Sequence, residues 1–177
     1  MIYVIRHGQT DLNKERKMQG RMGLPLNETG LEQADKLKDE LKDINFDFVF
    51  SSPQERAVQT AEIVTGLKAK TDERLDVYGL GDADRVPVNE VKMAGLLPDA
   101  NVYKGVEDPN HFVQRVFEFM NELKRHTVKR EINILISGHR CTKGCIGAFF
   151  ERLPANGNIL KFSSDTGHFK VYQFGDR

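Results

Sequence analysis

The sequence has few cysteines, no excess of charge of either sign and no long hydrophobic run. Its 26 basic residues are balanced by 26 acidic ones, so the formal net charge is zero. Proteins that bind nucleic acids generally carry a basic excess, so we expect no nucleic-acid partner. No apolar run approaches the roughly 20 residues that a membrane-spanning helix needs, so we also expect no association with a membrane.

The two cysteines, Cys141 and Cys145, lie four positions apart in a segment whose pattern predicts a helix. They indicate reduced thiols and not a disulfide framework. A phosphatase with a cysteine nucleophile would need an arginine soon after that cysteine, and Gly147 and Glu151 stand at the corresponding positions. The first apolar run begins at Ile2 and leaves no room for a signal peptide, so the expected location is the cytoplasm.

Strand-like and helix-like segments alternate along the chain of 177 residues, a length that predicts one domain over residues 1–177. Short apolar or alternating runs predict strands at 2–5, 46–50, 132–136 and, as a final edge strand, 168–174. Apolar residues at helical spacing predict helices over 30–43, 53–67 and 112–123. Thr29 and Ser52 are the expected N-caps of the first two. This alternation favours an α/β fold with a largely parallel sheet.

Three of these strands are each followed by cationic or titratable side chains. Arg6 and His7 follow the first strand, Arg56 lies early in the helix after the second, and His139 with Arg140 follows the third. Because the carboxyl ends of parallel strands meet at one edge of a sheet, we expect these side chains on one rim. A neutral imidazole is a nucleophile, and guanidinium groups bind tetrahedral oxyanions. The sequence therefore predicts a pocket for a dianion.

Paired histidines also bind metals, which is the competing interpretation of this rim. The sequence contains no His-x-x-x-His motif and no local cluster of carboxylates with histidines. Neighbouring arginines would also repel a metal cation. We therefore expect neither a metal nor a cofactor.

Several short motifs keep a fixed order over nearly the whole chain. They are Arg6-His7-Gly8-Gln9-Thr10 with Asn13, Gln19-Gly20-Arg21 with Pro25-Leu26 and Gly30, Ser51-Ser52-Pro53 with Arg56 and Thr60-Ala61, Glu107 with Phe112 and Arg115, and His139 after a strand. This set resembles the histidine phosphatase superfamily of phosphoglycerate-mutase-like proteins. The resemblance implies a three-layer α/β/α sandwich around a mostly parallel sheet.

The resemblance also implies roles for individual residues. His7 would be the nucleophile that becomes phosphohistidine, and Arg6, Arg56 and His139 would bind the transferring phosphoryl group. Positioning and charge stabilisation, which these residues supply, are most of what phosphoryl transfer requires. The substrate would be a small-molecule phosphate ester, and further contacts to it are expected from Asn13, Gln19 and Gly20.

Three positions depart from the family pattern, and one of them, Gly23, where an acidic residue is common, carries no inference. Members usually place a proton-donating glutamate where this chain has Val77. Asp76, Asp82 and Asp84 lie nearby, and we choose Asp76 as the predicted general acid. Arg140 replaces a usual glycine, so it either contacts the substrate, as we predict, or faces solvent.

Three functions fit these motifs. The first is a metal-independent phosphatase that hydrolyses a phosphomonoester through phosphohistidine. The second is a phosphotransferase of the phosphoglycerate mutase type, although mutases with similar motifs are generally longer. The third, suggested by the missing glutamate, is a non-catalytic protein that binds a phosphorylated ligand. The sequence indicates neither the physiological substrate nor the oligomeric state.

Overall fold

A five-stranded sheet forms the centre of the computed structural model, which describes residues 1–127 and 129–175. Its strands, in sheet order, are β3 (Lys70–Thr71), β2 (Phe48–Ser51), β6 (Ile134–Gly138), β1 (Ile2–Arg6) and β7 (Phe169–Tyr172). Four of them are parallel, whereas β7 pairs antiparallel with β1 at the sheet edge. The predicted mostly parallel sheet and its final edge strand are therefore confirmed.

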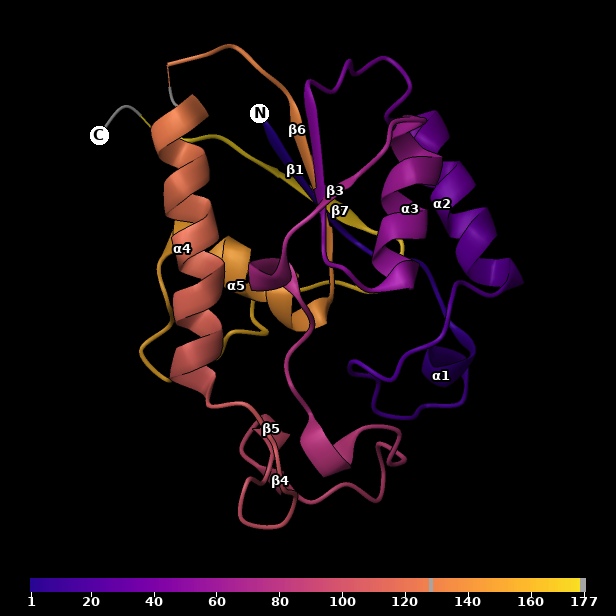
Figure 1. The fold of residues 1–177 in the computed structure, drawn as a ribbon, viewed down its shortest axis with the longest axis vertical. Coiled ribbons are helices and arrows are strands. Elements are labelled where there is room, and N and C mark those ends of the chain that lie inside the picture. Colours follow the sequence, from indigo (N-terminus) through magenta and orange to yellow (C-terminus); the bar gives the residue numbers. More distant parts are fainter. Residues whose placement is uncertain (128, 176–177) are drawn as a thin grey trace.

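Helices cover both faces of this sheet, so the fold has three layers (Figure 1). One face carries α2 (Glu28–Glu40) and α3 (Glu55–Thr65), and the other carries α4 (Pro109–Thr127) and α5 (Arg140–Glu151). This arrangement confirms the predicted α/β/α sandwich. None of the described helices is long and apolar enough to cross a membrane.

Each face of the sheet has its own apolar core. Ile5 and Leu135 pack with α2 and α3 in one core, whereas Val4 and Ile136 belong to the core beneath α4 and α5. Neighbouring residues of a strand point to opposite faces, so an apolar strand such as β1 serves both layers. Because β1 is buried on both faces, the point at which the chain leaves the sheet is fixed. The residues of the site begin at that point.

The starts of α2 and α3 differ from those predicted. Asn27 caps α2, because its Oδ1 accepts the Gly30 N–H at 2.9 Å, so Thr29 lies inside the helix. Helix α3 begins after Gln54, and no side chain caps it. The hydroxyl of Ser52 accepts the Gln54 N–H at 3.3 Å but stands outside the helix. The two predicted N-caps are therefore wrong by two residues each.

Short elements lie beyond the carboxyl ends of the parallel strands (Figure 1). They are α1 (Asp11–Lys14), the 3₁₀ turns Glu73–Leu75 and Gly81–Ala83, and a hairpin of β4 (Met93–Ala94) and β5 (Leu97–Pro98). Most of them come from residues 69–108, where the sequence has no clear period. They form the surroundings of the site.

Candidate active site

The three long parallel strands end at one level and bring their following residues together. Register pairs Arg6 of β1 with Gly138 of β6, and Ser51 of β2 with Ser137 of β6. His7 and His139 consequently follow adjacent strands, and their ring centroids lie 5.2 Å apart. The rim predicted from the sequence thus contains two facing imidazoles.

The ring of His7 is oriented by a hydrogen bond to the neighbouring backbone. Its Nδ1 lies 2.6 Å from the carbonyl oxygen of Gly8, and the side chain is buried. A carbonyl only accepts hydrogen bonds, so Nδ1 carries the hydrogen and Nε2 keeps its lone pair. Burial, reinforced by the charges of Arg56 and Arg6, lowers the pKa of His7 well below its usual value. The ring is therefore neutral at pH 7.

Arg6 and Arg56 place two positive charges beside this imidazole. Arg6 donates from Nη1 to the carbonyl of Ser164 at 2.9 Å, and Arg56 donates from Nη2 to the carbonyl of Gly20 at 3.0 Å. Burial lowers the pKa of each guanidinium to about 10, which leaves both charged at neutral pH. Neither forms an ion pair with a carboxylate of residues 1–127 or 129–175. Their charge is thus available to an anion.

Four buried nitrogen atoms around His7 lack a hydrogen-bond partner within the described part of the chain. They are Arg6 Nε, Gln19 Nε2, Arg56 Nε and His139 Nδ1. Buried polar groups in folded proteins are nearly always paired, so such a group of free nitrogens indicates a ligand. The other ring nitrogen of His139, Nε2, lies 2.7 Å from Ser52 Oγ. A hydroxyl hydrogen donated there leaves Nδ1 as an N–H donor, and a tetrahedral oxyanion would accept from all four groups.

A cavity of about 640 Å³ opens at this rim. Its polar wall contains Arg6, His7, Asn13, Gln19, His139 and Arg140. Three predicted residues, Arg56, Gly20 and Asp76, are not part of the wall. Arg56 is almost completely buried behind it, and Gly20 holds Arg56 through its carbonyl. Arg140 lines the cavity although its side chain is exposed.

Asn13 and Gln19 are held by hydrogen bonds to their side-chain oxygens. Asn13 Oδ1 accepts the N–H of Thr10 at 3.0 Å, which closes the capping box of α1. Gln19 Oε1 accepts from Thr10 Oγ1 at 2.9 Å and from the Leu24 N–H at 3.2 Å. Because their oxygens are used within the protein, both residues have amino groups to offer to an anion.

The structure does not bring the three aspartates near position 77 into the cavity wall. Asp76 Oδ1 accepts from Gln54 Nε2 at 2.9 Å and from the Val77 N–H at 2.7 Å, and Oδ2 lies 3.5 Å from Arg21 Nε. Asp82 is exposed, and Asp84 accepts the N–H groups of Gly20 and Met22. Val77 itself lines the cavity. Asp76 as general acid stays a prediction, and its carboxylate is occupied elsewhere.

A C-terminal segment that the sequence did not single out completes the site. Arg6 and His7 accept the Gly167 N–H through their carbonyls at 3.2 Å, and the Arg6 N–H donates to the carbonyl of His168 at 3.0 Å. Lys143, buried in α5, donates to Ser164 Oγ, so one residue contacts both Lys143 and Arg6. The sequence of residues 152–167 shows no helical or strand periodicity. The position of this segment beside Arg6 and His7 is therefore evident only from the pairing of β7 with β1.

Arg115 and Glu107 fix the wall of the cavity from behind. Arg115 donates from Nε and Nη2 to the two carboxylate oxygens of Glu107, each at 2.8 Å. It also donates to the carbonyls of Arg74, Asp76 and Val77. Such planar, bidentate pairing holds both partners in one geometry. This pair therefore positions the segment that carries Val77.

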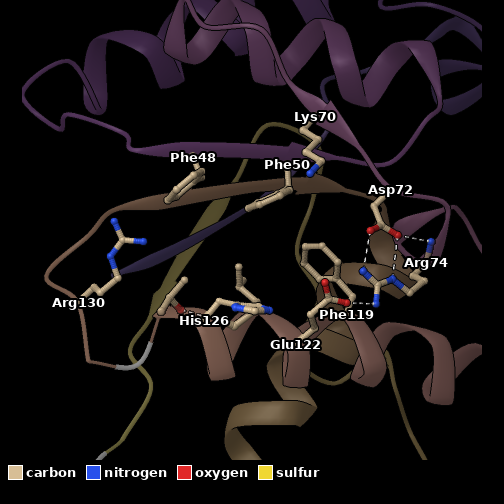
Figure 2. A pocket seen from close by; sticks show the side chains of 11 residues that line it. Phe48, Phe50, Lys70, Asp72, Arg74, Phe119, Glu122, His126 and Arg130 are labelled. Carbon is tan, nitrogen blue, oxygen red and sulfur yellow. Dashed lines mark hydrogen bonds and ion pairs between the residues drawn. The ribbon is translucent and has the colours of Figure 1, made fainter.

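A second cavity, of about 220 Å³, lies between β2, β3 and α4 (Figure 2). Arg74 on its wall is already paired, with Asp72 at 2.8 Å and with Glu122 at 2.7 Å. The wall shown in Figure 2 also contains the aromatic rings of Phe48, Phe50 and Phe119, together with Lys70, His126 and Arg130. The residues described around it include no buried histidine, so the two buried imidazoles belong to the larger cavity alone.

Comparisons with known proteins agree with this geometry. The family model of the histidine phosphatase superfamily (branch 1) matches residues 2–176. The uncharacterized phosphatase PhoE of Bacillus subtilis (strain 168) is 29% identical over 140 residues, which are 77% of this chain and 71% of PhoE. The matches to other curated relatives cover between 25% and 66% of the length of those proteins.

Two solved structures share the fold. The alpha-ribazole phosphatase from Shigella flexneri superposes with a TM-score of 0.79 at 27% identity, covering 95% of this chain and 87% of that one. A phosphoglycerate mutase from Thermus thermophilus gives a TM-score of 0.70 at 22% identity, with 95% and 90% covered, and shows that the fold is phosphoglycerate mutase-like. With a family model that matches nearly every residue, this chain belongs to the histidine phosphatase superfamily.

Proposed function

We propose that this protein is a metal-independent phosphatase that hydrolyses a small-molecule phosphomonoester through a phosphohistidine on His7. The observation that carries the proposal is the group of four unpaired buried nitrogens around a neutral imidazole. Membership of the histidine phosphatase superfamily, and relatives that bear phosphatase names, support a phosphoric monoester hydrolase.

In the first half of the reaction, Nε2 of His7 attacks phosphorus and the bond to the ester oxygen breaks. Arg6, Arg56 and His139 bind the phosphoryl oxygens, on which the charge of the transition state is spread. Asn13 and Gln19 offer further N–H donors, and Arg140 at the cavity wall binds the rest of the substrate. In the second half, water attacks the phosphohistidine, the P–N electron pair returns to Nε2, and phosphate leaves.

A non-catalytic role is the alternative that a specific observation favours. Val77 lies in the cavity wall, and Asp76 is held by Gln54 and Arg21. A protein without a proton donor could still bind a phosphorylated ligand through the same nitrogens. A phosphotransferase of the phosphoglycerate mutase type, the remaining function predicted from the sequence, would also have to bind a second phosphorylated ligand.

The deciding experiment measures phosphate release from a panel of phosphomonoesters in the presence of EDTA. The expected result is release by the wild type, none above background by His7→Ala, and normal release by His126→Ala, which removes an exposed histidine outside the larger cavity. Mass spectrometry of protein quenched at alkaline pH should find one phosphoryl group on His7. Binding of phosphate esters without His7-dependent release would refute the phosphatase and favour the binding protein.

A further inference from the structure

We infer that the substrate is an aryl phosphate, with an apolar aromatic body and a leaving group that departs as an anion without protonation. This inference rests on the proposed function, because it concerns the ester that His7 attacks. Two features of the larger cavity carry it. One is the apolar character of its outer wall, and the other is the state of every group there that holds a transferable proton.

The outer wall of the cavity is apolar over most of its extent. It comes from the 3₁₀ turns and the β4–β5 region and includes Leu80, Val88, Val91, Met93, Leu96 and Leu97. Val88, Met93 and Leu96 are 52%, 44% and 51% exposed, so they face water at the mouth. Covering such side chains stabilises a complex by about 25 cal/mol per Å² of apolar area.

The apolar wall and the phosphate-binding groups line one cavity and come from different segments of the chain. Its volume of about 640 Å³ falls in the range of about 300–1,000 Å³ that holds drug-sized ligands. A phosphate ion alone would leave most of that volume unused. The charge pattern therefore matches an amphipathic ester, with its phosphate at Arg6 and His7 and its apolar body against Leu96 and its neighbours.

Apart from His139, which is assigned to the phosphoryl oxygens, the groups on the wall that hold a transferable proton are engaged or poorly suited. The hydroxyl of Tyr78 donates to the carbonyl of Glu107, and burial raises its pKa to about 12. Burial also raises the pKa of the Cys141 thiol to about 11. Lys17 is paired with Glu15 at 3.1 Å. Tyr78 and Cys141 therefore hold their protons too tightly for efficient transfer near neutral pH.

Carboxylic acids are nearly absent from the same wall. Among residues 1–127 and 129–175, Asp165 is the one carboxylate that lines the cavity, and it is exposed beside Arg6. Val77, which is buried in the wall, offers no proton. The same wall offers cations, Arg16 and Arg140, and apolar side chains to a departing oxygen, but no buried carboxylic acid among the described residues.

The chemistry of the step then selects the leaving group. As the bond between Nε2 of His7 and phosphorus forms, the P–O bond breaks and its electron pair stays on the departing oxygen. An aryl oxide bears that electron pair well, because phenols have a pKa of about 10. An alkoxide does not bear that electron pair well, so an alkyl ester needs a general acid to protonate the departing oxygen. Such an acid contributes about 10²–10⁴-fold in rate. The aryl oxide takes its proton from solvent afterwards, so the products are a phenol and phosphate.

The test compares kcat/KM for phenyl phosphate and cyclohexyl phosphate, which match in size and apolarity and differ in leaving-group acidity. The expected preference for phenyl phosphate is about 10²-fold or more. Val77→Glu, which supplies an acid at the wall, should raise kcat/KM for cyclohexyl phosphate about 10²-fold, whereas Val77→Gln, of equal size, should not. Asp165→Asn should leave the phenyl-to-cyclohexyl ratio unchanged. For the apolar wall, Leu96→Ser should weaken the binding of naphthyl phosphate, measured as a higher KM.

The outcomes separate this inference from the proposed function. Equal rates for phenyl and cyclohexyl phosphate in the wild type overturn it, and that comparison needs no variant to fold. A preference that changes in Asp165→Asn overturns it as well, because Asp165 is then the proton donor. His7-dependent release from small polar esters alone refutes the aryl substrate and leaves the phosphatase intact. An absence of His7-dependent release from every ester refutes the phosphatase itself.

Discussion

Substitution of Gly23 by alanine tests how strictly the position of Arg56 controls activity. A Cβ atom at Gly23 would lie 1.9 Å from Nη1 of Arg56. The guanidinium would have to move by about 1.5 Å to reach an ordinary contact distance. Gly23 does not have a positive φ, so alanine fits the backbone, and the displaced atom ends a flexible side chain. The stability of the fold should therefore change little, whereas the phosphoryl oxygens lose a donor.

A misplacement of about 1 Å in a catalytic group costs about 10²-fold in rate. We therefore expect kcat/KM of Gly23→Ala to fall by about 10²-fold, equivalent to about 2.7 kcal/mol of transition-state stabilisation. Melting by circular dichroism should give a Tm close to that of the wild type. Gly175→Ala is the matched control, because nothing lies within 4 Å of its added Cβ and its φ is not positive. Full activity in a folded Gly23→Ala would refute the assigned role of Arg56.

The remaining predictions concern charge and metal. Although burial opposes it, hydrogen bonds from Arg115 and Gly79 lower the pKa of Glu107 from 4.5 to about 2. The pair therefore stabilises the fold above pH 4.5, and the Tm of the wild type should fall relative to that of Glu107→Gln as pH drops from 4.5 towards 2. Burial, with Arg6 and Lys170 nearby, lowers the pKa of Lys143 from 10.5 to about 8. The unfolded chain keeps that proton longer, so the unfolding free energy of the wild type should rise relative to Lys143→Met between pH 8 and 10.5. If Glu107→Gln or Lys143→Met showed the same pH dependence of stability as the wild type, the corresponding assignment would be wrong. Activity should survive dialysis against EDTA, because guanidinium groups supply the positive charge, and a loss restored by added metal would contradict this.

The central strands and the order of the rim residues could be predicted from the sequence because each depends on local pattern. An apolar run buried on both faces is a strand, and the residue after it must lie at the sheet edge. His7 and His139 follow such runs directly. The helix starts could not be predicted in this way. Asn27 and Thr29 are both good caps, and a tertiary contact decides between them: a Cβ at Gly30 would come within 2.1 Å of the Gln9 carbonyl oxygen.

Other parts of the site depend on partners far away in the sequence. Ser52 has the properties of an N-cap, yet its hydroxyl lies against His139, 87 positions further along the chain. Ser164 and Asp165 stand in a segment without period, and their place follows from the antiparallel pairing of β7. The general acid could not be predicted from the sequence for a different reason. Aspartates surround position 77 in the sequence, but hydrogen bonds turn Asp76 and Asp84 towards other groups.

The position of β1 in the sheet has a consequence for biosynthesis. Its two neighbours are β6 and β7, so β1 cannot pair until residues 134–172 have been synthesised. The hydrogen bond from Arg6 to the Ser164 carbonyl spans 158 positions. Contacts of such long separation form slowly, and until they form the apolar β1 stays exposed. A nascent chain that lacks β7 therefore carries Arg6 and His7 but not the contacts from residues 164–168 that hold them in place.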